Sequence, residues 1–113
     1  MAYQEMITPW GRAQTVTELA PGISFYITAS HGGIRLDTEH QEKIAGVRAR
    51  NFLLSLEWWK EDSDWSVPYA FFWPEIAPRD PEYPRMIISA MRTIFAMHRE
   101  VIGKFRSPNL RAF

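Results

Sequence analysis

Three carboxylates between two tryptophans are the side chains of this chain best suited to chemistry or binding. Glu61, Asp62 and Asp64 lie between Trp59 and Trp65. Hard cations prefer carboxylate oxygen, and desolvated carboxylates bind strongly to arginine-rich protein surfaces. Aromatic rings are frequent anchors of protein interfaces. Because the run lacks the spacing and the glycine of a calcium loop, we interpret it as a surface that binds a basic partner, and we keep metal binding as the alternative.

The tetrapeptide Ser30-His31-Gly32-Gly33 is the second candidate. A histidine beside glycine amides could act as a general base next to an oxyanion pocket. Adjacent residues of a strand point to opposite faces, which places Ser30 and His31 poorly for a direct dyad. We therefore expect a glycine turn between two strands, capped by a side chain, and retain Ser30 and His31 as partner-binding candidates.

The enzymatic alternative is a metal-dependent hydrolase or nuclease that uses His31 with Asp62 and Asp64. It requires these three side chains to converge. The other two histidines suggest structural roles. His98 follows the apolar stripe of a predicted helix and is expected in the core, whereas His40 belongs to a polar helix and is expected to face solvent.

Composition limits the class of protein. The 113 residues are 46% apolar and 14% aromatic, which predicts one folded domain spanning residues 1–113. Thirteen basic residues balance thirteen acidic ones, so direct nucleic-acid binding is not favoured. Charge is nevertheless segregated, because residues 51–83 hold two basic and seven acidic side chains and residues 84–113 hold six and one. The many aromatic residues leave homodimerisation through an apolar patch open.

The absence of cysteine excludes disulfides, thiolate metal sites and cysteine nucleophiles. The first residues lack a basic region followed by an apolar one, which argues against secretion, and no apolar run approaches the ~20 residues that cross a bilayer. We therefore expect a cytoplasmic protein without a membrane contact. No sequence feature calls for a cofactor.

Local patterns predict the elements of the N-terminal half. Alternation and β-branched residues indicate strands over residues 12–19 and 23–29, joined by a turn at Ala20-Pro21-Gly22. Residues 34–36 resume the alternation after the glycines and complete an antiparallel meander. Asp37 or Thr38 can cap a short helix that extends to about Ala45.

The C-terminal half is predicted to add a strand and a long helix. Residues 65–73 are strand-like, with Pro68 requiring an edge or a bulge. Residues 85–105 carry an apolar stripe at three- and four-residue spacing, and Pro84 suits the first turn of this helix. The expected fold is α+β: an antiparallel sheet of about four strands packed on one long C-terminal helix, plus a short helix.

Three stretches in order resemble an uncharacterised domain family of phages, plasmids and integrated elements of bacteria. They are TPWGRAQ at residues 8–14, APGI followed by TASHGG within residues 20–33, and WKEDSDW at residues 59–65. The family's last motif typically reads WYEEDCDW, so this chain departs from it with Lys60 at the first Glu and Ser63 at the Cys. The resemblance covers residues 8–75 and implies an accessory protein of a mobile element, of which anti-CRISPR proteins are the familiar anti-defence kind.

The sequence thus favours a non-enzymatic inhibitor from a mobile genetic element. Its acidic-aromatic surface is expected to dock on a basic site of a host protein or of a CRISPR-type defence ribonucleoprotein in a bacterial cytoplasm. Reversing the charge of Glu61, Asp62 and Asp64 to Lys is expected to abolish binding and to leave the fold intact. A further alternative is salt-dependent nucleic-acid binding through Arg92 and Arg99.

Overall fold

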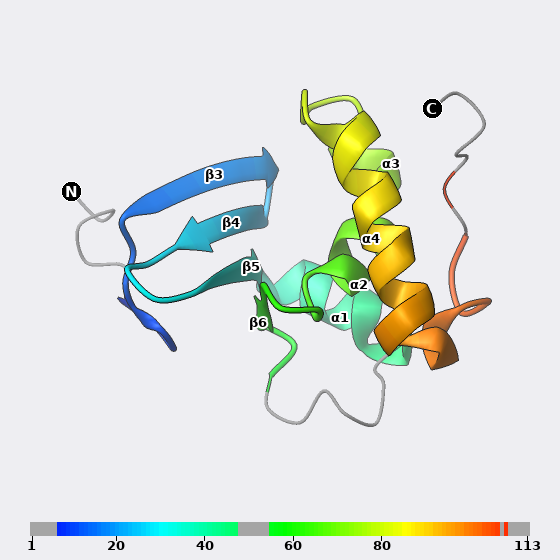
Figure 1. Cartoon of the computed structure of the whole chain (residues 1–113), viewed down its shortest axis with the longest axis horizontal. Coiled ribbons are helices and arrows are strands. Elements are labelled where there is room, and N and C mark those ends of the chain that lie inside the picture. The colour runs from blue at the N-terminus through cyan, green and yellow to red at the C-terminus, as the bar shows by residue number, and fades with distance from the viewer. Residues whose placement is uncertain (1–6, 48–54, 107, 109–113) are drawn as a thin grey trace.

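The protein is an α+β domain, and in the described part of the chain a small sheet packs against four helices (Figure 1). The computed structural model describes residues 7–47, 55–106 and 108. Its strands are β1 (Ile7–Thr8), β2 (Gly11–Arg12), β3 (Thr15–Ala20), β4 (Ile23–Ile27), β5 (Gly32–Leu36) and β6 (Trp58–Lys60). Its helices are α1 (Thr38–Ile44), α2 (Ser66–Phe71), α3 (Trp73–Ile76) and α4 (Tyr83–Met97), with 3-10 turns η2 (Ala45–Val47) and η3 (Arg99–Val101).

The main sheet is an antiparallel meander in the order β3-β4-β5-β6, and β1 and β2 form a separate two-stranded hairpin. The predicted turn at Ala20-Pro21-Gly22 joins β3 to β4, with Gly22 at a φ of +86° that favours glycine. A Cβ at Gly22 would also collide with the Asp37 carboxylate. The predicted meander is therefore confirmed.

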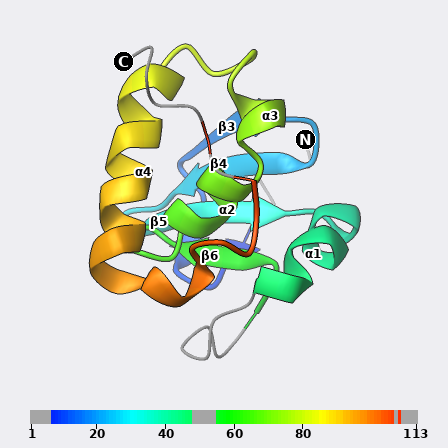
Figure 2. The ribbon, with the colours of Figure 1, turned by 90° about the vertical axis from the view of Figure 1, so that its right-hand side faces the viewer.

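Alternation along the strands gives the sheet two different faces. Ile34 is paired with Phe25 on one side and Trp59 on the other, and this row points into the core. The next row, formed by Ser24, Arg35 and Trp58, points to the opposite face. The helices lie on the inner side of the sheet, with α2 between α4 and α1 (Figure 2).

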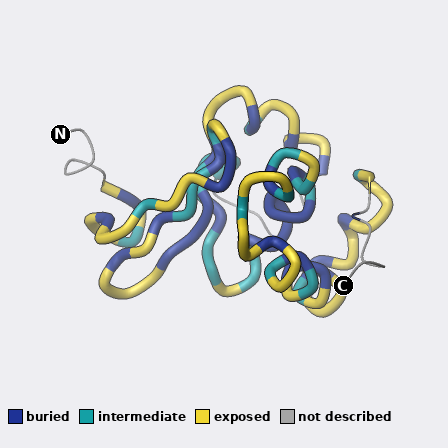
Figure 3. The backbone as a smooth tube through the Cα atoms, turned by 90° about the horizontal axis from the view of Figure 1, so that it is seen from above, coloured by how far each residue is buried: buried dark blue, intermediate teal, exposed yellow. Residues whose placement is uncertain are grey.

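The core lies where the sheet meets the helices, and the strand ends and loops remain exposed (Figure 3). It is one cluster of buried side chains that joins the inner sheet row to α1, α2, α3, α4 and η3. Its largest fully buried members include Trp59, Tyr69 and Ile87. Burial of each such side chain contributes roughly 1.5–3 kcal/mol.

The fourth strand differs from the predicted one. Residues 65–73 were expected as a strand, but α2 and the start of α3 occupy them, and the sheet is instead completed by β6. Pro68 is compatible with α2 because it falls in the first turn, where backbone N–H groups have no intrahelical acceptor. All residues from Ser66 to Ala70 are buried, so the segment carries no helical alternation that the sequence could reveal.

The other helices agree better with the sequence. Asp37, one of the two predicted caps, caps α1 by accepting a hydrogen bond from the backbone N–H of His40. Pro84 lies in the first turn of α4, also as predicted, but the helix ends at Met97 and not near residue 105. The chain continues through η3, which keeps Val101 in the core. Among the described helices, none is both long and apolar enough to cross a membrane.

Candidate functional site

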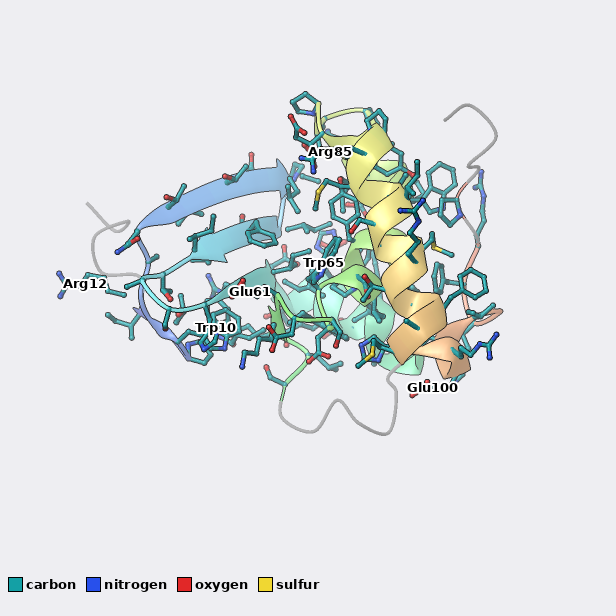
Figure 4. All side chains as sticks on the ribbon, viewed as in Figure 1. Trp10, Arg12, Glu61, Trp65, Arg85 and Glu100 are labelled. Carbon is teal, nitrogen blue, oxygen red and sulfur yellow. The ribbon has the colours of Figure 1, made fainter. Side chains whose placement is uncertain are left out.

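The three sequence motifs meet at one end of the sheet. The hydroxyl groups of Thr28 and Ser30, in the β4–β5 turn, each lie 3.4 Å from the carbonyl oxygen of Trp10, in the β1–β2 hairpin. The backbone N–H of Gly32 donates to the Glu61 carboxylate, 2.7 Å away, which follows β6. Trp10 and Glu61 thus come from distant parts of the chain to the same region (Figure 4).

The predicted turn at Ser30-His31 is present and is organised by a buried threonine. Thr28 Oγ1 accepts hydrogen bonds from the backbone N–H groups of Ser30 (3.3 Å) and His31 (3.1 Å). The same hydroxyl lies 2.7 Å from the His31 carbonyl oxygen, to which it can donate. One side chain therefore satisfies most of the turn's polar backbone groups. Ser30 and His31 are both exposed on this turn.

The Trp10 ring packs on Gly33, whose lack of a side chain allows the close contact. A Cβ at this position would lie 2.5 Å from Trp10 Cη2 and 2.3 Å from the Trp59 carbonyl oxygen. Gly33 is paired with Lys60 across the β5–β6 ladder, so Trp10 covers the outer face of the sheet beside β6. Gly32 and Gly33 were expected in a turn, but both lie in β5. Gly33 is needed there because the Trp10 ring packs directly on its backbone.

A cluster of aromatic rings occupies this outer face. Trp58 makes edge-to-face contacts with Trp10 and Tyr26, with ring centroids 5.7 and 5.1 Å apart. The Arg35 guanidinium lies 5.6 Å from the centre of the Trp58 ring and 2.8 Å from the Glu57 carboxylate. Glu57 raises the pKa of Arg35 by this hydrogen bond, despite the opposing effect of burial. Such ring and cation–π contacts are worth roughly 0.5–1.5 kcal/mol each.

Trp10 and Trp58 are functional candidates that the sequence reasoning did not select. Both rings are half-buried, and their remaining area faces outward. The period of two in β6 contains the relevant signal, because Trp58 and Trp59 must point to opposite faces of the sheet. Burying Trp59 therefore leaves Trp58 at the surface.

Trp59 and Trp65, which were expected at the partner-binding surface, lie in the core. Trp59 is 1% exposed and donates its indole N–H to the Leu56 carbonyl oxygen at 2.8 Å. Trp65 is 8% exposed and packs edge-to-face on Tyr69. Large rings gain most when fully desolvated, and the four-stranded sheet offers them its inner face. Neither ring is presented to a partner.

The three candidate carboxylates point in different directions. Asp62 is the most exposed, with 70% of its side chain accessible, and lies 3.7 Å from Lys60 Nζ. Glu61 is bound to the Gly32 amide and lies 3.5 Å from His31 Nδ1. Asp64 instead turns inward to the buried His98. Only Glu61 and Asp62 remain on the face that Trp10 and Trp58 share.

This divergence removes the convergence that the metal-dependent alternative requires. Asp62 approaches Lys60, Asp64 approaches His98, and His31 has Glu61 as its acidic neighbour. Over residues 7–47, 55–106 and 108, no three His, Cys, Asp or Glu side chains are grouped to hold a metal ion.

Ser63, Asp64 and His98 meet without forming a catalytic triad. His98 is in the core, as predicted, and its Nε2 lies 3.1 Å from Ser63 Oγ and 3.4 Å from Asp64 Oδ1. In a triad the carboxylate and the hydroxyl bind opposite ring nitrogens. Here they share one nitrogen of a histidine that is 4% exposed. Burial raises the pKa of Asp64, against the lowering effect of His98. These contacts join the loop that carries Ser63 and Asp64 to His98 at the end of α4.

His40 was expected to face solvent and is instead buried between two carboxylates. Its Nδ1 lies 2.6 Å from Asp37 Oδ1, its Nε2 lies 2.9 Å from Glu75 Oε1, and its ring packs edge-to-face on Phe72. The reason for the error is non-local, because Phe72 and Glu75 reach α1 from the region of α3. With both ring nitrogens occupied, His40 has no nitrogen available to act as a base.

The two carboxylates set the charge of His40. Burial alone lowers its pKa, but the hydrogen bonds to Glu75 and Asp37 outweigh this effect and leave the pKa above 6.5. The backbone N–H of His40 and its ring in turn lower the pKa of Asp37. Neutral imidazole can donate only one hydrogen bond, so the protonated ring alone satisfies both carboxylates.

We call the exposed surface at this end of the sheet the motif face and define it by Trp10, His31, Trp58, Glu61 and Asp62. Trp10 and Trp58 contact each other on this face, and Glu61 and Asp62 follow the end of β6, with Lys60 beside Asp62.

Comparison with known proteins identifies the family of this chain. No curated protein and no solved structure matches the chain. The model of a domain of unknown function, DUF7007, matches residues 3–109 and so spans nearly the whole sequence. The chain therefore belongs to the DUF7007 family.

Proposed function

We propose that this protein is a non-enzymatic inhibitor that docks its motif face on a basic site of a host protein or ribonucleoprotein complex. The observation that carries the proposal is the convergence of three separated motifs on one exposed face, through Trp10, the Ser30-His31 turn and Glu61.

The chemistry of the face favours binding over catalysis. His40 and His98 are buried and engaged by neighbouring carboxylates. His31 is accessible, but its Nδ1 lies 3.5 Å from the Glu61 carboxylate, and the adjacent Ser30 hydroxyl lies 3.4 Å from the Trp10 carbonyl oxygen. His98 does lie 3.1 Å from the Ser63 hydroxyl, but this histidine is 4% exposed and the same nitrogen faces Asp64, so a substrate has little access to the pair.

The expected partner carries lysine or arginine beside an apolar patch. Trp10 and Trp58 supply rigid rings that lose little conformational entropy on binding. Glu61 and Asp62 supply carboxylates, which steer a basic partner and fix its orientation. The resemblance to proteins of mobile elements supports a CRISPR-type defence complex as the partner class and the bacterial cytoplasm as the place of action.

A capture experiment with three tagged proteins tests the proposal. The bait proteins are the wild type, Asp62→Lys and Glu100→Lys, and proteins retained from a lysate of the bacterial host are quantified by mass spectrometry. Asp62 and Glu100 are both exposed, so the two variants make the same charge change, but Glu100 lies near the end of α4, away from the motif face (Figure 4).

We expect one host complex to be retained by the wild type and Glu100→Lys and to fall about tenfold or more with Asp62→Lys. Equal retention by all three proteins, or an equal loss in both variants, would remove the motif face as the contact. Asp62→Lys replaces the triple reversal of Glu61, Asp62 and Asp64. Lysine at position 64 would place an ammonium group beside the buried His98 in place of the Asp64 carboxylate, so that variant would confuse loss of binding with loss of fold.

A further inference from the structure

A second surface lies along the free edge of the sheet. In the part of the chain that the structure describes, β3 is paired with β4 on one side and with no strand on the other (Figure 1). An edge strand presents alternate N–H and C=O groups that an additional strand can bind. The register of β3 shifts between Glu18 and Ala20, so the regular edge comprises residues 15–18.

A groove adjoins this edge on the inner side of the sheet. Its volume is about 200 Å³, and its apolar walls include Leu19 from β3, Phe25 from β4 and Met86 from α4. Side chains of a strand point alternately to the two faces of its sheet. A strand added beside β3 would therefore direct every second side chain toward this groove.

The rim of the groove carries negative charge. Asp80 accepts hydrogen bonds from the Tyr69 hydroxyl (2.8 Å) and the Glu82 backbone N–H (3.0 Å). Over the described residues, no lysine or arginine nitrogen lies within 4 Å of the carboxylates of Asp80 or Glu18. Glu82 lies on the same rim and pairs with the exposed Arg85.

We propose that this edge binds an extended, basic segment of a protein partner by strand addition to β3. An apolar side chain of the segment enters the groove beside Leu19 and Met86, and a flanking lysine or arginine approaches Asp80. A basic side chain on the other face of the segment lies opposite Glu18. Main-chain hydrogen bonds supply affinity, while the groove and the carboxylates select the sequence.

This surface is separate from the motif face, so each of the two proposals can be tested without the other. The motif face is built on the outer side of β5 and β6, whereas the groove lies between the inner side of β3 and the start of α4. Asp62→Lys should leave peptide binding at β3 unchanged.

A library of displayed random twelve-residue peptides provides the probe. We expect selection on the wild-type protein to enrich peptides in which apolar residues alternate with lysine or arginine. Addition of one such synthetic peptide to ¹⁵N-labelled protein should shift the backbone amide signals of residues 15–18 most strongly. Failure to enrich any peptide, or shifts centred elsewhere, would overturn the proposal.

Methylation of the peptide backbone tests strand addition without altering the protein. Methyl groups on one alternate set of peptide nitrogens should abolish binding, and methyl groups on the other set should leave it within about threefold. Equal binding by both methylated peptides would show that no ladder forms.

Charge reversal provides a matched test on the protein side. Glu18→Lys should weaken the peptide about tenfold, because a favourable cross-strand pair becomes a repulsive one. Glu100→Lys changes the net charge equally and should leave the affinity unchanged. An equal loss in both variants would indicate attraction to net charge alone and would contradict a site at β3.

Discussion

Replacement of Glu75 by glutamine should destabilise the fold in a way that depends on pH. Glu75 holds His40 from one side and Asp37 holds it from the other, at 2.9 and 2.6 Å. Gln is nearly isosteric with Glu, so the variant removes the charge of one partner and leaves Phe72 and the rest of the packing in place. The amide oxygen can still accept a hydrogen bond from His40, so the main loss is the attraction between the carboxylate charge and the imidazolium.

The size of the effect follows from burial. A hydrogen bond to a charged group contributes roughly 1.5–3 kcal/mol. His40 is buried but the Glu75 side chain is 39% exposed, and solvent screening reduces the value to about 1.5 kcal/mol. For a domain of this length that loss lowers the Tm by about 6 °C.

The pH dependence has a definite sign. The pKa of His40 is higher in the folded protein than its ordinary value of 6.5, so its stabilising contribution is complete below that pH and is lost as the pH rises through the folded pKa. The variant should therefore differ most from the wild type below about pH 6.5 and least at alkaline pH.

Urea unfolding at pH 5.5 and pH 9 measures the effect. We expect the free energy of unfolding to fall by about 1.5 kcal/mol at pH 5.5 and by less than about 0.5 kcal/mol at pH 9. Glu39→Gln, which affects an exposed pair with Lys43 on the same helix, should change it by less than about 0.5 kcal/mol at both values. Equal destabilisation at both pH values, or none at pH 5.5, would refute a charged His40 bridge.

Further changes test the candidate site and its support. Gly33→Ala should lower the free energy of unfolding, measured by thermal unfolding, by about 2–4 kcal/mol, because the added Cβ collides with the Trp59 backbone. Gly46 has open space around it, so Gly46→Ala should lower this free energy by less than about 0.5 kcal/mol. Equal effects of the two substitutions would contradict the packing at Gly33. Thr28→Val should lower the free energy of unfolding by about 1–3 kcal/mol, because the backbone N–H groups of Ser30 and His31 lose their acceptor. An unfolding curve in urea that matches the wild type would contradict this role of Thr28. Asp64→Asn should be neutral or stabilising by up to about 1 kcal/mol at pH 7, since burial disfavours the ionised form; a loss above about 1 kcal/mol would mean that attraction to His98 outweighs that burial.

Local signals were sufficient for the meander and for α1. The alternation of β4, the Pro21-Gly22 turn and the Asp37 cap each act within a few residues, and the structure places them as predicted. The α+β class followed from these elements together with the apolar stripe of α4.

Non-local burial explains the main errors. The segment around α2 has buried residues on consecutive positions, which removes the periodicity that separates a helix from a strand. His40 is buried because Phe72 and Glu75 come from more than thirty residues away. The sequence likewise grouped Asp64 with Glu61 and Asp62, but the position of His98 draws Asp64 inward.

The candidate site was predictable only in part. The turn at Ser30-His31 and the choice of Glu61 and Asp62 as binding candidates follow from residue types near a strand end. Predicting that Trp58 lies at the surface required the register of β6, since a shift of one residue would place Trp59 there instead. The contact between Trp10 and Gly33 joins two distant parts of the chain and could be recognised only from the fold.

Photocrosslinking in living cells tests the central claim, that the motif face contacts a host protein, most directly. The photoreactive residue p-benzoylphenylalanine replaces Asp62 in one variant and Glu100 in another, and crosslinked proteins are identified after irradiation. We predict one host protein joined at position 62 and not at position 100. The same crosslinks at both positions, or none at position 62, would contradict the proposed function.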